Sequence, residues 1–181
     1  MTKEQLDKLS SPAKLIAAAR WIIEEGKDAE YTVRGVASRA GVNHGLVHHY
    51  FKSMEGLSLA LFDEFAEELL ERLMANLPEN PDQATFLRSL GENLTREKST
   101  ARFFIAFATL SQQMPKLKAR MAEVAAQRRE MMKKLLGMEA METLTLFQAV
   151  LFGSLFMAQV DPGVSPAHLL EYLNRHLQVN P

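Results

Sequence analysis

The segment 32–51 restricts the fold more than any other part of the sequence, because it predicts two short helices joined by Ala40-Gly41-Val42. A helix-turn-helix needs a small residue where its helices cross, a turn residue that tolerates a positive φ angle, and apolar residues that face inward. Ala37 is the small residue and Gly41 is the turn residue. The residues expected to face inward are Val36, Ala40, Val42 and Val47. The segment therefore predicts a helix-turn-helix.

The rest of the chain also shows apolar residues at helical spacing, and no stretch has the alternation typical of a strand. A first helix is expected to begin with Ser11 as its cap and to end at Gly26. Thr32 and Asn43 are the expected caps of the two short helices. The further predicted helices cover 53–77, 82–95, 99–113, 116–136, 140–160 and 166–178. The sequence thus predicts an all-α fold of about nine helices, with a domain boundary near residue 53.

Composition limits the class of protein. The chain of 181 residues is 47% apolar and 24% charged, which is typical of a globular protein with a real core. It has no cysteine, and its polar N-terminus lacks the apolar run of a secretory signal, so a cytoplasmic location is expected. The longest uncharged stretch, 143–160, contains Thr, Gln, Ser and Gly, which favours a buried helix over a membrane span. One face of this helix could pack on the core and the other on a second subunit.

The second short helix separates apolar from polar residues when it is drawn as a helical wheel. Leu46, Val47 and Tyr50 lie on one side. The opposite side carries Gly45, His48, His49 and Lys52, with His44 at its edge in the first turn. The ring of Tyr50 could pack inward, or its hydroxyl could reach a phosphate, and the sequence leaves both possibilities open.

The charge of this region favours nucleic acid as its partner. Residues 31–54 contain Arg34, Arg39 and Lys52 and no acidic residue, a local charge of +3, whereas the whole chain carries −1. Such segregation is typical of a small DNA-binding element, although a run of charge by itself is usually a solvated surface.

The alternative for the histidines is a metal site, since His44 and His48 have the spacing of two ligands on one helix. The glutamate of a zinc-protease helix is missing between them, and His168 and His176 lie at the far end of the chain. No metal or other cofactor is therefore expected. No nucleophile or acid–base pair converges in the sequence either, so we expect a protein that is not an enzyme.

A dense set of residues resembles the N-terminal signature of the tetracycline-repressor-like (TetR) family of bacterial regulators. The matching residues are Thr32-Val33-Arg34, Val36-Ala37, Ala40-Gly41-Val42-Asn43, Gly45, Tyr50-Phe51, Ser53, Glu55 and Leu57. The resemblance implies a homodimer that reads successive major grooves of a palindromic operator. It places base contacts on His44, Gly45, His48 and His49 and phosphate contacts on Thr32, Arg34, Tyr50 and Lys52. With Asn43 from the same segment, these are the candidate DNA-binding residues.

The chain departs from similar sequences at two positions in this segment. They often have Tyr where His48 stands and a phosphate-binding Lys where Met54 stands. We therefore expect DNA binding to depend more than usual on Arg34, Arg39 and Lys52.

The resemblance also implies that residues 1–53 form the DNA-binding domain and residues 54–181 a helical domain for effector binding and dimerisation. Phe103, Phe107 and Met114 are the candidate effector-binding residues, although such residues are often simply core. The basic stretch 116–136 is either a solvated helix face or an attraction for an anionic molecule.

The expected dimer interface comes from the last two predicted helices, which would form a four-helix bundle with a second subunit. Its candidate residues are Phe147, Val150, Leu151, Ser154, Leu155, Ala158, Leu169 and Leu173. The predicted function is that of a repressor released from its operator by a small apolar or amphipathic ligand. The alternatives are a helical adaptor or ligand-binding protein of the same fold without operator binding, and a metal-dependent enzyme.

Overall fold

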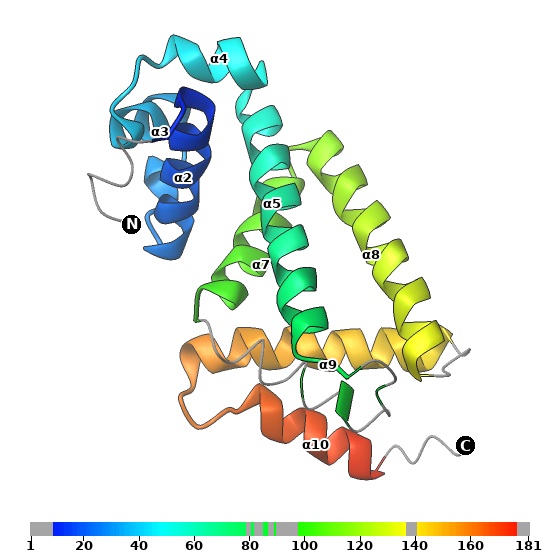
Figure 1. Cartoon of the computed structure of the whole chain (residues 1–181). Helices are drawn as coiled ribbons and strands as arrows, with labels where there is room; N and C mark the ends of the chain where they lie inside the picture. Colours follow the sequence, from blue (N-terminus) through cyan, green and yellow to red (C-terminus); the bar gives the residue numbers. More distant parts are fainter. Residues whose placement is uncertain are drawn as a thin grey trace. The chain divides into compact units, whose positions relative to one another are not determined.

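The computed structural model describes residues 9–78, 81, 85, 86, 89, 98–136 and 141–176. These residues form eight α-helices and one 3-10 helix, and none of them lies in a β-strand (Figure 1). The predicted all-α fold is therefore confirmed. Of the helix expected over 82–95, only residues 85, 86 and 89 are described, and all three are helical. Within the described ranges, no helix is long and apolar enough to cross a membrane.

The helices begin and end close to the positions expected from the sequence. In chain order the elements are α2 (Ser11–Glu24), η1 (Asp28–Glu30), α3 (Val33–Ala40), α4 (Gly45–Phe51), α5 (Met54–Ala75), α7 (Lys98–Ser111), α8 (Pro115–Leu136), α9 (Met141–Val160) and α10 (Pro166–His176). Two expected caps are wrong. Ser11 is already helical, and Ser10 precedes the helix without making a side-chain cap bond. The cap residue of α4 is His44 and not Asn43. Pro12 in the first turn of α2 suits the helix start, since its missing N–H would have no partner there in any case.

The chain divides into two compact units. The first contains residues 1–67 and 102–121, and the second contains residues 68–101 and 122–181. The helix-turn-helix therefore shares its unit with the start of α5, most of α7 and the start of α8. The functional boundary expected at residue 53 remains a prediction.

The first unit is built around α2, which packs against α3 and α4 (Figure 1). Alanines occupy the places where helices approach closely, and Ala18, Ala19 and Ala37 are all buried. Leu15, Ile22 and Val36 fill the centre and have no exposed surface. Burying apolar side chains of this size stabilises a fold by about 1.5–3 kcal/mol each, so this small core can hold three short helices together.

The long helix α5 buries one apolar row. Leu57, Leu61, Phe65 and Leu69 are four residues apart on α5, and all four are buried. In the first unit the ring of Phe65 stacks on that of Phe103, with 4.7 Å between their centroids.

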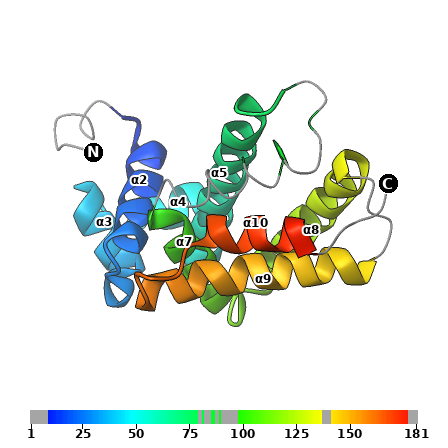
Figure 2. The same ribbon diagram turned by 90° about the horizontal axis from the view of Figure 1, so that it is seen from below.

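In the second unit, α9 and α10 lie side by side (Figure 2). Helix α9 is apolar on nearly every side, but its two faces differ in exposure. Leu151, Ser154 and Leu155 are buried, whereas Phe152 and Phe156 are 43% and 53% exposed. The hydroxyl of Ser154 donates to the carbonyl oxygen of Leu151 at 2.8 Å, so this buried polar group is satisfied.

Candidate nucleic-acid interface

Local hydrogen bonds set the positions of α3 and of the turn that follows it. Thr32 is the expected cap of α3, and its Oγ1 accepts the N–H of Gly35 at 3.1 Å. Gly41 ends α3 in the left-handed region with φ 67°, as predicted, and glycine adopts this conformation without a steric penalty. The N–H of Val42 donates to the carbonyl oxygen of Ala37 at 3.0 Å, which closes the turn.

The side chain of Asn43 stabilises the start of α4. Its Oδ1 accepts the N–H of Gly45 at 2.8 Å, so the side chain satisfies a donor at the helix start although His44 is the formal cap residue. The side-chain oxygen of Asn43 is therefore engaged within the protein. His44 and Gly45 are both exposed at this end of α4.

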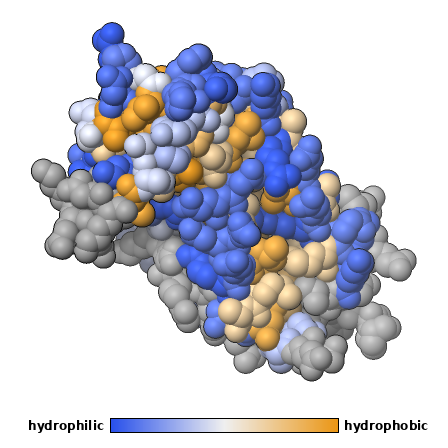
Figure 3. Space-filling model, turned by 45° about the horizontal axis from the view of Figure 1, so that its top comes forward, coloured by the Kyte–Doolittle hydropathy of each residue, from blue (hydrophilic) through white to orange (hydrophobic). Residues whose placement is uncertain are grey.

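The face of α4 opposite the core is exposed and carries the predicted polar residues. Val47 is 1% exposed and anchors the helix, whereas His48, His49 and Lys52 are exposed. Figure 3 shows the molecule with the top of Figure 1 turned forward. The surface seen there is mainly hydrophilic, with patches of apolar residues between. The division of α4 into an inner and an outer side is therefore confirmed for these four residues.

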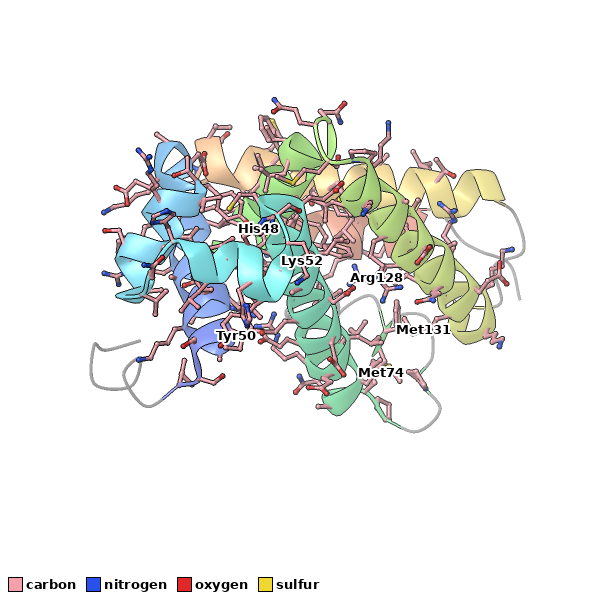
Figure 4. All side chains as sticks on the ribbon, turned by 90° about the horizontal axis from the view of Figure 1, so that it is seen from above. His48, Tyr50, Lys52, Met74, Arg128 and Met131 are labelled. Atoms are coloured by element: carbon pink, nitrogen blue, oxygen red, sulfur yellow. The ribbon has the colours of Figure 1, made fainter. Side chains whose placement is uncertain are left out.

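The side chain of Tyr50 is exposed and does not pack inward. It is 43% exposed, and its ring packs edge-on against His49 with 4.7 Å between centroids. Figure 4 shows it on the opposite flank of α4 from His48. Phe51, the next residue, is half-buried. The wheel alone placed the Tyr50 ring beside Val47, and the structure shows that this side of the last turn is open.

Lys52 ends α4 in an unusual backbone conformation. Its φ of 68° is the only positive φ at a non-glycine residue among those described. Its N–H donates to the carbonyl oxygen of His48 at 3.0 Å, and its Nζ donates to that of His49 at 3.1 Å. An L-residue in the left-handed region costs about 1–2 kcal/mol, so the turn into α5 holds the lysine there against its intrinsic preference.

The cations of the segment are not equivalent. Arg34 is exposed near the start of α3. The guanidinium carbon of Arg39 lies 3.6 Å from the centre of the Trp21 ring, and Lys27 lies 4.5 Å from the same ring. The expected contribution of Arg39 to DNA binding therefore has to compete with a contact inside the protein.

The histidines of α4 do not belong to a recognisable metal cluster. Among the residues whose positions the structure gives, no group of three or more histidine, aspartate or glutamate side chains could hold a metal ion.

Four residues that hold α3 and α4 in place were not predicted from the sequence. The hydroxyl groups of Tyr31 and Ser58 are 3.0 Å apart, which joins the segment just before α3 to α5, and the hydroxyl of Ser58 donates to the carbonyl oxygen of Met54. Burial raises the pKa of Tyr31 to about 12, and the hydrogen bond with Ser58 opposes the shift. Gly35 and Gly56 pass so close to the carbonyl oxygens of Glu30 and Phe51 that a β-carbon would overlap them. A glycine inside a helix was the only available signal.

The candidate effector residues lie in the first unit. Phe103 and Phe107 are buried in an aromatic cluster, where Phe107 packs edge-on against Phe62 with 5.2 Å between centroids. Met114 is half-buried just before α8. Phe103 and Phe107 are thus core residues, and their contact with an effector remains a prediction.

The candidate dimer residues are only partly suited to contact a partner. Leu151, Ser154 and Leu155 are buried within the chain itself, so the face of α9 predicted to contact a partner has to be corrected. Val150 and Ala158 are half-buried, and Leu169 is 38% exposed. The side chains of Phe147 and Leu173 lie outside the described part of the chain.

Comparison with known proteins agrees with this geometry. Residues 15–61, which run from α2 into α5, match the family model of bacterial regulatory proteins of the tetR family. The chain is similar to a transcriptional regulator from Rhodococcus sp. Rha1, with 26% identity and a TM-score of 0.73 over 90% of this chain and 91% of the other. No curated protein matches the chain at a significant level.

Two further solved structures share the fold. One, from Streptomyces coelicolor, has 19% identity and a TM-score of 0.72 over 91% of this chain and 96% of the other. A second, from Rhodococcus sp. RHA1, has 14% identity and a TM-score of 0.67 over 93% and 95% of the respective chains.

Proposed function

We propose that this chain, which belongs to the tetR family of bacterial regulatory proteins, represses transcription by binding a palindromic operator as a homodimer. The observation that carries the proposal is the exposed, acid-free face of α4, where His48, His49 and Lys52 project from a helix anchored by Val47. Such a helix can enter the major groove and offer imidazole groups to base edges. Lys52 and Arg34 would neutralise phosphates and fix the register.

The exposed stripe of α9 supports the homodimer. The stripe consists of Leu146, Phe152, Phe156, Met157 and Val160, whose exposed fractions lie between 43% and 68%. Gly153 is exposed beside it, and a β-carbon there would meet nothing within 4 Å, which leaves room for a second helix to approach. Leu169 and Tyr172 add exposed apolar surface on α10. Apolar side chains of this size usually cover one another in an interface.

Sedimentation tests the dimer directly. The wild-type chain should sediment as a dimer at micromolar concentration, and Phe156→Glu should shift it towards monomer because a carboxylate would be buried in the interface. Leu70→Glu is the control, since Leu70 is also an exposed large apolar residue, at 38%, but lies outside the stripe. A wild-type monomer at that concentration would contradict the proposal.

A small apolar or amphipathic effector is proposed to release the repressor. Its support lies in the second unit, where Figure 4 shows Met74 on α5 and Arg128 and Met131 on α8. This set is distinct from the candidate residues Phe103, Phe107 and Met114 of the first unit. Met74 is 46% exposed, and Met131 is half-buried. Methionines adapt to irregular apolar shapes, which suits the apolar part of such a ligand. Such a ligand would shift α5 and lower operator affinity, and DNA would weaken ligand binding by the same factor.

A fluorescence or electrophoretic assay with the DNA flanking the gene tests the function. Specific binding that an extract of small molecules abolishes would support a ligand-released repressor. Specific binding that only the extract permits would indicate a corepressor. The absence of any specific binding would favour a helical protein of this fold without operator binding.

A further inference from the structure

The carbonyl groups at the end of α2 are satisfied in two different ways. The N–H of Lys27 donates to Ile22 at 2.9 Å and the N–H of Gly26 donates to Ile23 at 3.1 Å. This is the usual pattern of a helix that ends at a left-handed glycine, and Gly26 has φ 67°. The next carbonyl, that of Glu24, accepts from Nη1 of Arg102 at 2.6 Å, although Arg102 lies 78 residues further along the chain.

Arg102 provides a cation at the C-terminus of α2. The last turn of α2 contains no basic residue, and the carbonyl groups at a helix C-terminus favour a nearby cation. Gly26 also provides the space for this contact, because a β-carbon there would lie only 3.3 Å from Arg102 Nη1. The glycine therefore serves both the turn and the approach of the guanidinium group.

Phe103, the neighbour of Arg102 on α7, holds the same side of α2 one turn earlier. The guanidinium carbon of Arg20 lies 5.6 Å from the centre of the Phe103 ring, and Arg20 Nη2 pairs with Glu64 Oε1 of α5 at 2.8 Å. Arg20 and Glu24 are four residues apart and so lie on one face of α2. Arg102 and Phe103, two consecutive residues of α7, thus contact that face at two points. All of these residues belong to the first unit.

We propose that Arg102 is a positioning residue for DNA recognition, which fixes α2 and through it the helices α3 and α4 that meet the operator. Because α2 shares its buried core with α3 and α4, a shift at its C-terminus has to move them or loosen their packing. Helix α7 also carries the predicted effector residues Phe103 and Phe107. Through the contact of Arg102 with α2, a movement of α7 can reach α3 and α4 without depending on α5 alone.

The experiment compares Arg102→Ala and Arg102→Lys with Lys118→Ala. Lys118 is an exposed cation of the same unit, so its removal controls for the general loss of positive charge. The probe is a duplex selected by the wild-type protein from a random pool. Three quantities are measured: the dissociation constant at several salt concentrations, the amide hydrogen exchange of residues 20–28, and the melting temperature as a check of folding.

Arg102→Ala should weaken binding about fivefold or more, without changing the salt slope, and should speed amide exchange at the end of α2. Arg102→Lys should recover part of both effects, and Lys118→Ala should leave the exchange unchanged. A salt slope lowered by about one unit would mean that Arg102 contacts phosphate directly, and an unchanged affinity would mean that the contact does not position the reading helices. Either result overturns the inference.

The inference about DNA recognition rests on the proposed function, and the two can fail separately. If the wild-type chain selects no duplex from the pool, the proposed function fails and, with it, the role of Arg102 in recognition. If the chain binds DNA and Arg102→Ala binds as tightly as Lys118→Ala, the proposed function stands and the positioning role is refuted.

Discussion

Lys52 combines a strained backbone with a predicted phosphate contact, and two substitutions separate these properties. Lys52→Ala removes the charge but leaves an L-residue at φ 68°. Lys52→Gly removes the charge and also the steric cost of that conformation. Both variants lose the same side chain beyond the β-carbon, so the difference between them reports the backbone alone.

The expected difference in stability follows from the conformation. An L-residue in the left-handed region costs about 1–2 kcal/mol, and glycine gives back about 0.4–1 kcal/mol because its unfolded chain is more flexible. Lys52→Gly should therefore be more stable than Lys52→Ala by about 1 kcal/mol. In a protein of this size that difference corresponds to roughly 2–4 °C in melting temperature.

The expected change in DNA binding is the same for both variants. Each lost phosphate contact lowers the slope of log K against log salt by about 0.9, so binding becomes about 3.5-fold less sensitive to a rise from 50 to 200 mM salt. Thermal unfolding measures the first effect, and fluorescence anisotropy across a salt series measures the second. Equal melting temperatures would refute the backbone argument, and an unchanged affinity and slope would refute the phosphate contact.

Two further predictions concern residues next to α3 and α4. Burial raises the pKa of Tyr31 to about 12, above its value of about 10 in an unfolded chain, so its contribution to stability is present below pH 10 and is lost as the pH rises towards 12. Tyr31→Phe should therefore flatten the alkaline fall in stability seen by urea unfolding, whereas Tyr172→Phe, at a 54% exposed position, should not. Gly56→Ala should lower the free energy of unfolding by about 1–3 kcal/mol, because its β-carbon overlaps the carbonyl oxygen of Phe51; unfolding at the wild-type temperature would show that the junction yields without cost.

The helix-turn-helix could be predicted from the sequence because its determinants are local. The cap at Thr32 and the left-handed turn at Gly41 each depend on residues within a few positions along the chain. The buried side of α4 could also be predicted from the sequence, since Val47 is the centre of a short apolar stripe. The exposure of Tyr50, in contrast, could not be predicted in this way. Helical spacing placed this residue beside the stripe, but its exposure depends on how far the neighbouring helices extend.

The predicted effector site could not be located from the sequence for a different reason. Phe103 and Phe107 are candidates because large apolar residues can line a pocket, and the same residues can equally fill a core. The sequence pattern is identical in the two cases. The structure places both rings in an aromatic cluster with Phe62 and Phe65, so their first role is to stabilise the first unit.

The sequence by itself determined the helices, the reading segment and its charge, because capping, turn chemistry and helical spacing act over short distances along the chain. The tertiary structure alone decided which face of α9 is exposed. That helix is apolar on nearly all sides, so its spacing cannot distinguish Leu151, which is buried, from Phe152, which is not. The same holds for Arg102, whose contact with Glu24 joins positions 78 residues apart. Contacts between distant segments leave no periodic signal in the sequence, and only the packed chain brings their partners together.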